Sequence, residues 1–370
     1  MKNYKVKLSV PLMNGKEQEY IAHAISENEI GPRGRYLELF KKNISEYIES
    51  ENVSLLNSGT SAIHLGLKVL GVKEGDVVLC STFTFAASAF TIVYLGAEPV
   101  FVDSEYETWN MCPEQLEKAI VSEMNLGKKP KAIVVVHAYG MPAKMNELMA
   151  IAKHYDIPVL EDAAAAFGSE LNGQKCGTIG DLGVFSFNAN KIVSTGGGGA
   201  LVSQNKKYVE LANYYGSQAK DKVDFYKHSS LGYNYSMSNL TAAIGCAQLE
   251  SLEDKIQERR HIYESYKKSI QAIGFQKELV GIRSNRWLTC GTLESQVAVQ
   301  KTMNAALSKQ IEIGRLWNPM HCQPFFYKSR SYLNGCSEDL FKKGVTLPSS
   351  ENLTLEIQKE VAKIILDQTT

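Results

Sequence analysis

The chain has 370 residues, of which 44% are hydrophobic, so it can form a large domain and a smaller one, each with its own core. Lysine plus arginine and aspartate plus glutamate both total 40, and this balance gives no net field to attract nucleic acid or anionic lipid. No stretch reaches the roughly 18 apolar residues of a membrane span, and the first residues lack the apolar core of a signal peptide, so we expect a cytoplasmic protein without a membrane partner.

Short apolar runs alternate with helical segments between about residue 55 and residue 205. These runs cover residues 77–80, 99–103, 132–137, 158–162, 183–188 and 199–203. Most are apolar at successive positions, which is typical of strands buried on both faces of a parallel sheet. The predicted fold class is therefore α/β, with a mostly parallel central sheet flanked by helices.

Helical periodicity marks the segments between and after these runs. Helices are predicted over residues 61–70, 113–120, 145–154, 242–272 and 355–366. The charged helix 242–272 is expected to bridge two domains. We predict a large domain with an N-terminal arm over residues 1–250 and a smaller α+β C-terminal domain over residues 251–370.

Seven cysteines are scattered along the chain with no C-x-x-C pair. An odd total without paired spacing favours buried free thiols over disulfides or a structural zinc. The sequence therefore predicts no metal site.

Three polar turns follow predicted strands or open helices, where ligands bind in doubly wound folds. In the first, N-S-G-T-S-A at 57–62, Gly59, Thr60 and Ser61 open a helix whose free N–H groups suit a phosphate. An ordinary N-cap without a ligand explains this turn at least as well.

The second turn ends the run 158–162 in Glu161 and Asp162. A carboxylate at that position could keep a pyridine nitrogen protonated, so that the ring accepts electrons. A helix-capping role for Asp162 is equally compatible with the spacing.

The third turn is FSFNANK at 185–191, which places Lys191 after a buried strand and before four glycines. A partly desolvated lysine amine can be neutral and nucleophilic near neutral pH. The alternative is a surface lysine beside a glycine-rich hairpin. P-loop and dinucleotide-binding interpretations lack their required context, because no Gly-Lys-Ser/Thr follows and no helix opens after the glycines.

The order of these turns, with Lys191 29 positions after Asp162, resembles the DegT-type sugar aminotransferases over nearly the whole chain. These are fold-type I enzymes that depend on pyridoxal phosphate (PLP). The matching segments are SGT at 58–60, STFTF at 81–85, EDAA at 161–164, FSFNANK at 185–191 and GYNYSMSN at 232–239.

The resemblance implies a role for each matching residue. Lys191 would be the Schiff-base lysine and the proton carrier, and Asp162 would pair with the pyridine nitrogen. Phe85 would stack on the cofactor ring. Asn234 would reach the phosphate of the partner subunit, because the family's active sites are shared across a homodimer interface. The phosphate would be held by Gly59, Thr60, Ser61 and Ser186.

Further segments resemble a subgroup that aminates UDP-linked 4-keto-6-deoxy-N-acetylhexosamines for surface glycans, with L-glutamate as the usual amino donor. They include SNRWLT at 284–289 and LWNPMHCQP at 316–324. Arg315, Trp317 and His321 have side chains that suit a diphosphate, a uracil ring and a hydroxyl. A core tryptophan and a solvated arginine are the equally weighted alternatives.

Three residues depart from the family pattern. Ala165 stands where Gln, His or Glu usually approaches the cofactor's phenolic oxygen, Gly314 shifts the nearby arginine by one place, and Ser236 replaces an arginine. A different sugar, or a dTDP- or GDP-linked substrate, is therefore an alternative.

Three other activities are weighed against this one. A related dehydratase is disfavoured because such members replace the lysine with histidine, whereas Lys191 is present. A non-catalytic PLP- or sugar-binding regulator is disfavoured by the retained cofactor contacts. An NAD-dependent oxidoreductase lacks its glycine-rich turn after the first strand.

Overall fold

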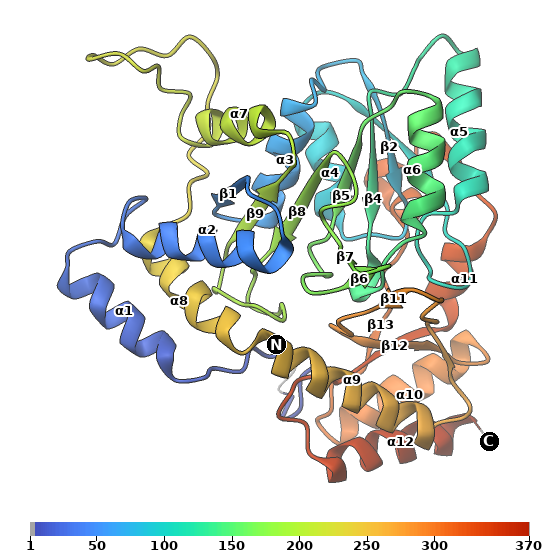
Figure 1. Ribbon diagram of the computed structural model, residues 1–370. Coiled ribbons are helices and arrows are strands. Elements are labelled where there is room, and N and C mark those ends of the chain that lie inside the picture. The colour runs from blue at the N-terminus through green and yellow to red at the C-terminus, as the bar shows by residue number, and fades with distance from the viewer. Residues whose placement is uncertain (1–3, 370) are drawn as a thin grey trace.

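The computed structural model describes residues 4–369 and has an eight-stranded sheet at its centre (Figure 1). The strand order is β1-β9-β8-β5-β4-β2-β3-β14. Strand β9 is antiparallel to both neighbours, and every other adjacent pair is parallel, which confirms the mostly parallel sheet. The strands are β1 (Val53–Leu56), β2 (Val77–Ser81), β3 (Glu98–Val102), β4 (Ala132–Val136), β5 (Val159–Asp162), β8 (Leu182–Ser186), β9 (Gly199–Val202) and β14 (Ser331–Tyr332).

Helices cover both faces of this sheet, because alternate strand residues enter different cores. Val78 and Cys80 pack in the cluster with α3 (Gly59–Val69), α4 (Ala86–Tyr94) and α7 (Lys206–Gly216). Val77 and Leu79 pack in the opposite cluster with α5 (Pro113–Asn125) and α6 (Met145–His154). The continuous apolar runs in the sequence follow from this two-sided burial.

The long helix expected over residues 242–272 is two helices, α8 (Asn239–Glu250) and α9 (Leu252–Ser269). Ser251 separates them with φ −111° and ψ 13°, and its hydroxyl donates to the carbonyl of Gln248 at 3.4 Å. A serine that bonds to nearby backbone competes with helix continuation. Helix α8 packs against α1 (Lys16–Ser26) and α2 (Arg35–Ile48), and α9 leads to the second sheet.

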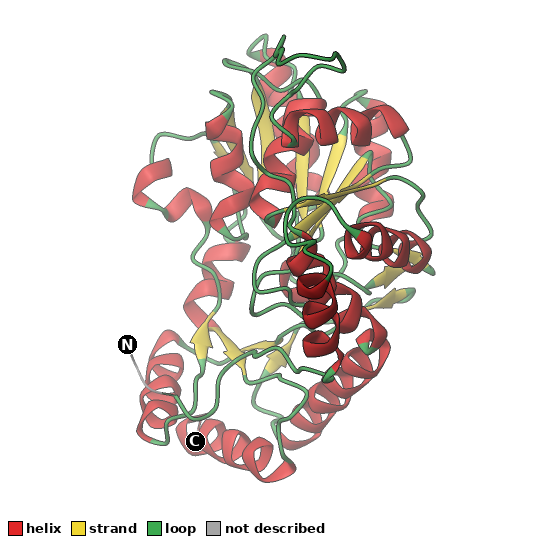
Figure 2. Ribbon diagram, turned by 90° about the vertical axis from the view of Figure 1, so that its left-hand side faces the viewer, coloured by secondary structure: helices red, strands yellow, loops and turns green. Residues whose placement is uncertain are grey.

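A smaller antiparallel sheet lies below the large one (Figure 2), in the order β10-β12-β15-β13. Its strands are β10 (Gly274–Phe275), β12 (Thr289–Thr292), β13 (Gly314–Arg315) and β15 (Gly344–Leu347), with helices α10 (Gln296–Ser308), α11 (Cys336–Lys343) and α12 (Leu355–Thr369). A third sheet joins β6 (Glu170–Leu171), β7 (Gln174–Lys175) and β11 (Ile282–Arg283). Short 3₁₀ turns are η1 (Ala138–Gly140), η2 (Met320–Cys322) and η3 (Pro324–Phe326).

The chain crosses between these sheets near both ends. Strand β14 returns to the large sheet beside β3, and Val6 pairs with Ile311 near the small sheet. The predicted division at residues 250/251 stays a prediction.

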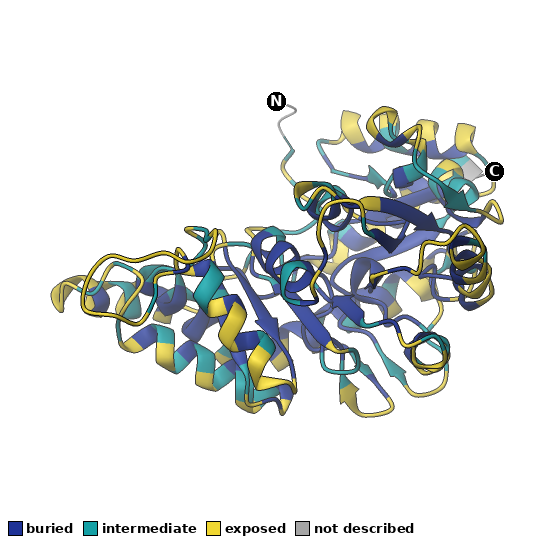
Figure 3. Cartoon of the chain, turned by 90° about the horizontal axis from the view of Figure 1, so that it is seen from above, coloured by how far each residue is buried: buried dark blue, intermediate teal, exposed yellow. Residues whose placement is uncertain are grey.

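An exposed arm, residues 217–234, projects from the end of α7 (Figure 3). Isolated bridges join Ser217 to Asn234 and Lys220 to His228, so the arm folds back on itself. It carries exposed apolar side chains at Val223, Phe225, Tyr226 and Leu231. Between residues 4 and 369, no helix combines the length and the apolarity that crossing a bilayer requires.

Candidate active site

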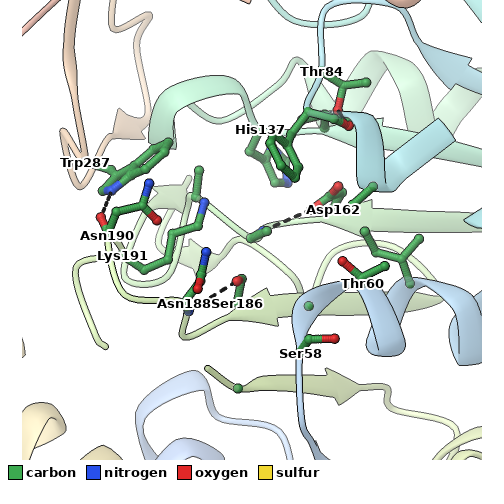
Figure 4. A pocket seen from close by; sticks show the side chains of 18 of the residues that line it. Ser58, Thr60, Thr84, His137, Asp162, Ser186, Asn188, Asn190, Lys191 and Trp287 are labelled. Atoms are coloured by element: carbon green, nitrogen blue, oxygen red, sulfur yellow. Dashed lines mark hydrogen bonds between the residues drawn. The ribbon is translucent and has the colours of Figure 1, made fainter. Parts of the chain in front are cut away.

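A cavity of about 350 Å³ opens at the carboxyl ends of β5 and β8, beside the N-terminus of α3 (Figure 4). This is the edge where doubly wound sheets bind ligands, and the volume lies within the range of small-molecule sites. Its lining combines polar groups from the strand ends with aromatic rings from the C-terminal part of the chain. The lining residues include Ser58, Gly59, Thr60, Thr84, Phe85, His137, Asp162, Ala164, Ala165, Ser186, Asn188, Asn190, Lys191, Gly197, Gly198, Trp287 and Trp317.

The N-terminus of α3 forms one side of the cavity. Ser58 is its N-cap, and the Ser58 hydroxyl accepts from the Ser61 amide at 3.0 Å. The first amides of a helix have no carbonyl of their own helix as partner, so those of Gly59 and Thr60 are suited to an anion. A Cβ atom on Gly59 would lie 2.9 Å from Cβ of Ser186, so glycine is needed for the close approach of β8. The N-cap interpretation of this turn is therefore confirmed, and the anion-binding interpretation stays a prediction.

Lys191 follows β8 and extends into the cavity from the side opposite α3 (Figure 4). Its amine lies over the Trp287 ring, 3.9 Å from the centroid. Burial lowers the pKa of Lys191 from 10.5 to about 8, and the nearby Asp162 charge opposes that effect. A substantial fraction of this amine is therefore neutral near pH 7 to 8 and can act as a nucleophile or a base.

Asp162, the last residue of β5, is 5% exposed and points into the same cavity. The Ser88 hydroxyl on α4 donates to its Oδ2 at 2.6 Å, and the Ala164 amide donates to Oδ1 at 3.1 Å. Ser88 also pairs with the Thr84 hydroxyl at 2.7 Å. These contacts fix the orientation of the carboxylate, which serves both the cavity and the local turn.

Glu161 precedes Asp162 and faces the other way, because successive strand residues alternate. Its carboxylate accepts from the amides of Gly177, Ile179 and Gly180. It also pairs at 2.9 Å with Nε2 of His137, a buried cavity residue. Nδ1 of His137 accepts from the Ala143 amide at 3.0 Å, so the ring proton is on Nε2. Glu161 therefore holds the fold around the site, whereas Asp162 faces the ligand space.

Trp287 and Trp317 line the cavity, and the buried ring of Tyr139 packs behind them. Tyr139 stacks on Trp317 with centroids 4.1 Å apart and lies parallel to Trp287 at 6.4 Å. The Trp317 amide donates to the Tyr139 hydroxyl at 2.7 Å. Tyr139 has φ 57°, a left-handed conformation that is uncommon for a bulky residue and is concentrated at functional sites.

The structure brings together most of the residues predicted from the sequence. Gly59, Thr60, Phe85, Asp162 and Ser186 all line the cavity with Lys191 and Trp317. Phe85 is 65% exposed, so one of its faces is free to cover a bound ring. Ala165 also lines the cavity and offers no side-chain hydrogen bond.

Four predicted residues lie outside the cavity lining. Ser61 is bound to Asn57 at 2.6 Å, and the Asn234 carbonyl accepts from the same asparagine at the base of the arm. Arg315 donates to Gln300 on α10 at 3.1 Å. His321 pairs through Nδ1 with the Thr82 hydroxyl at 2.7 Å.

Three residues near the reacting groups were not predicted: Ser88, His137 and Trp287. Ser88 lies three residues after Phe85, so helical spacing places the two on one side of α4, and the Ser88 hydroxyl reaches Asp162 at the end of β5. His137 ends a predicted strand, and the rule used for Asp162 applies to it as well. Trp287 belongs to the SNRWLT segment already singled out by resemblance.

Comparison with known proteins agrees with this geometry. The chain is 41% identical over 369 residues to EpsN of Bacillus subtilis, described as a pyridoxal phosphate-dependent aminotransferase, covering 98% of this chain and 95% of that one. It is 35% identical over 347 residues to a GDP-perosamine synthase of Escherichia coli O157:H7, covering 94% and 93%.

The fold matches that of a DegT DnrJ EryC1 StrS aminotransferase from Brucella abortus, with a TM-score of 0.91 and 26% identity over 96% of this chain and 95% of that one. The DegT/DnrJ/EryC1/StrS aminotransferase family matches residues 11–366. The chain therefore belongs to this family of PLP-dependent, fold-type I sugar aminotransferases.

Proposed function

We propose that the enzyme aminates C4 of a UDP-linked 4-keto-6-deoxy-N-acetylhexosamine, with L-glutamate as donor, for the synthesis of a surface glycan. The observation that carries transamination is the placement of Lys191 and Asp162 in one cavity with the α3 N-terminus. The sugar class is supported by the segments SNRWLT and LWNPMHCQP, whose tryptophans Trp287 and Trp317 both line that cavity.

The residues present fit the cofactor at its phosphate, its pyridine nitrogen and its ring. The amides of Gly59 and Thr60 and the Ser186 hydroxyl suit its phosphate, and the absence of a side chain on Gly59 lets Ser186 approach them closely. Asp162, oriented by Ser88, suits the pyridine nitrogen, and the exposed face of Phe85 suits the ring. When bound, PLP supplies an electron sink that stabilises negative charge on the substrate carbon.

The chain's own groups then perform the proton chemistry. Nζ of Lys191 takes the proton from the α-carbon of glutamate and later delivers one to C4 of the sugar. Its pKa of about 8 leaves both protonation states populated near neutral pH, as a group that takes and returns a proton requires. Asp162 would hold a proton on the pyridine nitrogen of the bound cofactor, and the Trp287 ring excludes water from the amine.

The substrate side of this proposal relies on Trp317 for stacking with the nucleotide base. Arg315 is bound to Gln300 and His321 is bound to Thr82, and neither side chain lines the cavity. In this conformation the diphosphate must therefore be held by other groups. A GDP-linked keto sugar is the second candidate, favoured by the relative described as GDP-perosamine synthase.

The proposal includes a homodimer in which the arm, residues 217–234, lies against the partner. Four large apolar side chains on the arm are exposed in the single chain, from 43% at Val223 to 79% at Tyr226. Exposed apolar side chains gathered on a projecting segment are typical of an interface. Asn234 lies at the base of the arm, where it is bridged to Ser217. A cytoplasmic location is also proposed, in keeping with seven cysteines that are all free thiols.

The first experiment records the visible absorbance of the PLP-loaded protein before and after addition of L-glutamate. We expect the cofactor band to move to the amine form in wild type and to stay unchanged in Lys191→Ala. Lys206→Ala, on the exposed surface of α7, is the matched control and should respond like wild type. An unchanged wild-type spectrum with glutamate would contradict L-glutamate as the amino donor, and failure to bind PLP would contradict the whole proposal.

A second experiment assigns the sugar. The loaded enzyme is given UDP-, GDP- and dTDP-linked 4-keto-6-deoxy sugars in turn, and the amino sugar is identified by mass spectrometry. The highest kcat/KM is expected for the UDP-linked N-acetylhexosamine. A preference for the GDP-linked sugar would transfer the proposal to the second candidate, and no product from any sugar would favour a regulator.

A further inference from the structure

Three side chains with metal-binding atoms meet outside the active-site cavity, at the junction of η2 and α11. His321 and Cys322 belong to η2, and Glu338 lies in the first turn of α11. One ligand atom from each lies within 4.8 Å of the others. None of the three lines the cavity, and the catalytic roles described above do not use them.

His321 provides the second observation. Its side chain is only 9% exposed, and Nε2 is buried without a hydrogen-bond partner among the described residues. The closest carboxylate atom, Oε1 of Glu338, is 3.6 Å away, beyond hydrogen-bond distance. A buried polar nitrogen without a partner destabilises the folded state, so a ligand that binds Nε2 would stabilise it.

The neighbours leave the facing atoms available. The other oxygen of Glu338, Oε2, pairs with Lys342 at 3.2 Å, which leaves Oε1 toward the histidine. Cys322 is the exposed thiol among the seven cysteines. Nδ1 of His321 is 2.7 Å from the Thr82 hydroxyl, the kind of outer contact that fixes the ring of a metal-binding histidine.

We propose that Nε2 of His321, Sγ of Cys322 and Oε1 of Glu338 form a zinc-binding site. Imidazole, thiolate and carboxylate are the ligands zinc takes in proteins, and three of them leave a fourth position for water. The nitrogen and sulfur ligands disfavour magnesium and calcium, which require oxygen. The sequence-based prediction of no metal site considered only regular cysteine spacing, whereas these ligands come from two separated segments.

The ion would connect two parts of the fold. It links η2, whose segment carries Trp317 into the active-site cavity, to α11 beside the small sheet. Because zinc binds this arrangement only in the folded chain, it stabilises the protein by mass action. The site therefore predicts a zinc-dependent increase in the thermal unfolding temperature.

The test uses the PLP-loaded enzyme, stripped with a chelator, dialysed against zinc chloride and analysed for bound metal. We expect one zinc per chain in wild type and none retained in His321→Ala or Cys322→Ser. Glu338→Gln should weaken binding, and Thr82→Val should weaken it by about 10- to 100-fold. The matched control is His261→Ala, which removes an exposed histidine near Glu258 and should keep the zinc.

A second readout reports the thiol directly. Zinc should slow the reaction of Cys322 with a thiol reagent, and cobalt in place of zinc should give visible absorption typical of four-coordinate geometry. Retention of zinc in Cys322→Ser or His321→Ala variants that fold and bind PLP would overturn the proposal. Substoichiometric zinc in wild type would also overturn it. Neither result depends on transamination, so the proposed function is tested separately.

Discussion

Two lysines in different parts of the molecule have the same lowered pKa and very different surroundings. Burial is the main cause for both Lys191, at the active-site cavity, and Lys255, on α9, and each pKa falls from 10.5 to about 8. Lys255 is 3% exposed and donates to Oε1 of Gln248 at 2.6 Å. The same glutamine donates to Glu17 at 2.6 Å, which closes the group within a polar cluster.

Lys191 makes no ion pair among residues 4–369, and its amine lies on an aromatic face at the edge of a cavity. A lowered pKa therefore does not identify a reactive lysine. Two features distinguish Lys191. An open cavity lies in front of its amine, and the carboxylate on the other side of that cavity, Asp162, is not paired with the lysine. Four predictions test this contrast, in order of decreasing effect.

The largest effect is expected from the lysines themselves. Lys191→Ala should lower kcat for transamination by more than about 10⁴-fold, because it removes both the nucleophile and the proton carrier. Lys255→Met should leave kcat within about threefold, because it removes only a structural group. Steady-state rates with glutamate and the keto sugar measure kcat for both variants. Equal losses of kcat would contradict the distinction between a catalytic and a structural lysine.

Adjacent carboxylates give the second prediction. Asp162→Asn should lower kcat by about 10²- to 10³-fold with little loss of stability, because the amide cannot hold the ring nitrogen's proton. Glu161→Gln should lower the free energy of unfolding by about 2 kcal/mol, because its carboxylate accepts from three amides and His137. Steady-state rates and denaturant unfolding of each variant separate the two roles. A large loss of stability in Asp162→Asn with a large loss of kcat in Glu161→Gln would contradict these roles.

The aromatic face gives the third prediction. Trp287→Ala should admit water to the Lys191 amine and raise its pKa by about one pH unit. The pH dependence of amine labelling in cofactor-free enzyme measures this, with the wild-type midpoint at about pH 8. Trp287→Phe should restore most of the wild-type value. Trp317→Ala, which removes the other cavity tryptophan, is the control and should leave the midpoint unchanged.

The smallest effect concerns stability and pH. Because the pKa of Lys255 is lower in the folded chain, the unfolded chain binds more protons between about pH 8 and 10.5. The free energy of unfolding should therefore increase with pH across that window, by at most about 1.4 kcal/mol per pH unit. Measured in a Lys191→Ala background, this slope should decrease in Lys255→Met. An unchanged slope would assign the effect to other groups.

Most of the large sheet could be predicted because its strands are determined by local pattern. The run at 132–137 is apolar at successive positions, and β4 is buried on both faces as expected. Strands such as β10 and β13 have only two residues each, and their pairing depends on partners far along the chain. Periodicity carries no information about such pairing. The break at Ser251 was missed for a similar reason, since the apolar spacing continues across it.

The same distinction applies within the candidate site. Lys191, Asp162 and Thr60 lie beside strand ends, and the topology of a parallel sheet brings such ends together. Arg315 was chosen by side-chain type alone, and strand β13 directs it toward Gln300 on α10. Trp317, two positions later, does reach the cavity because its stacking on Tyr139 orients it.

Strand β14 has a consequence for how the chain is synthesised. The edge of the large sheet beside β3 comes from residues 331–332, and Val6 pairs with Ile311. During translation the β3 edge is thus uncovered until some 330 residues have emerged, which is when an unpaired edge invites aggregation. The N-terminal segment likewise has no partner until late. Assembly on the ribosome is thus completed from the C-terminal side, and a truncated chain would lack a sheet edge as well as its last helix.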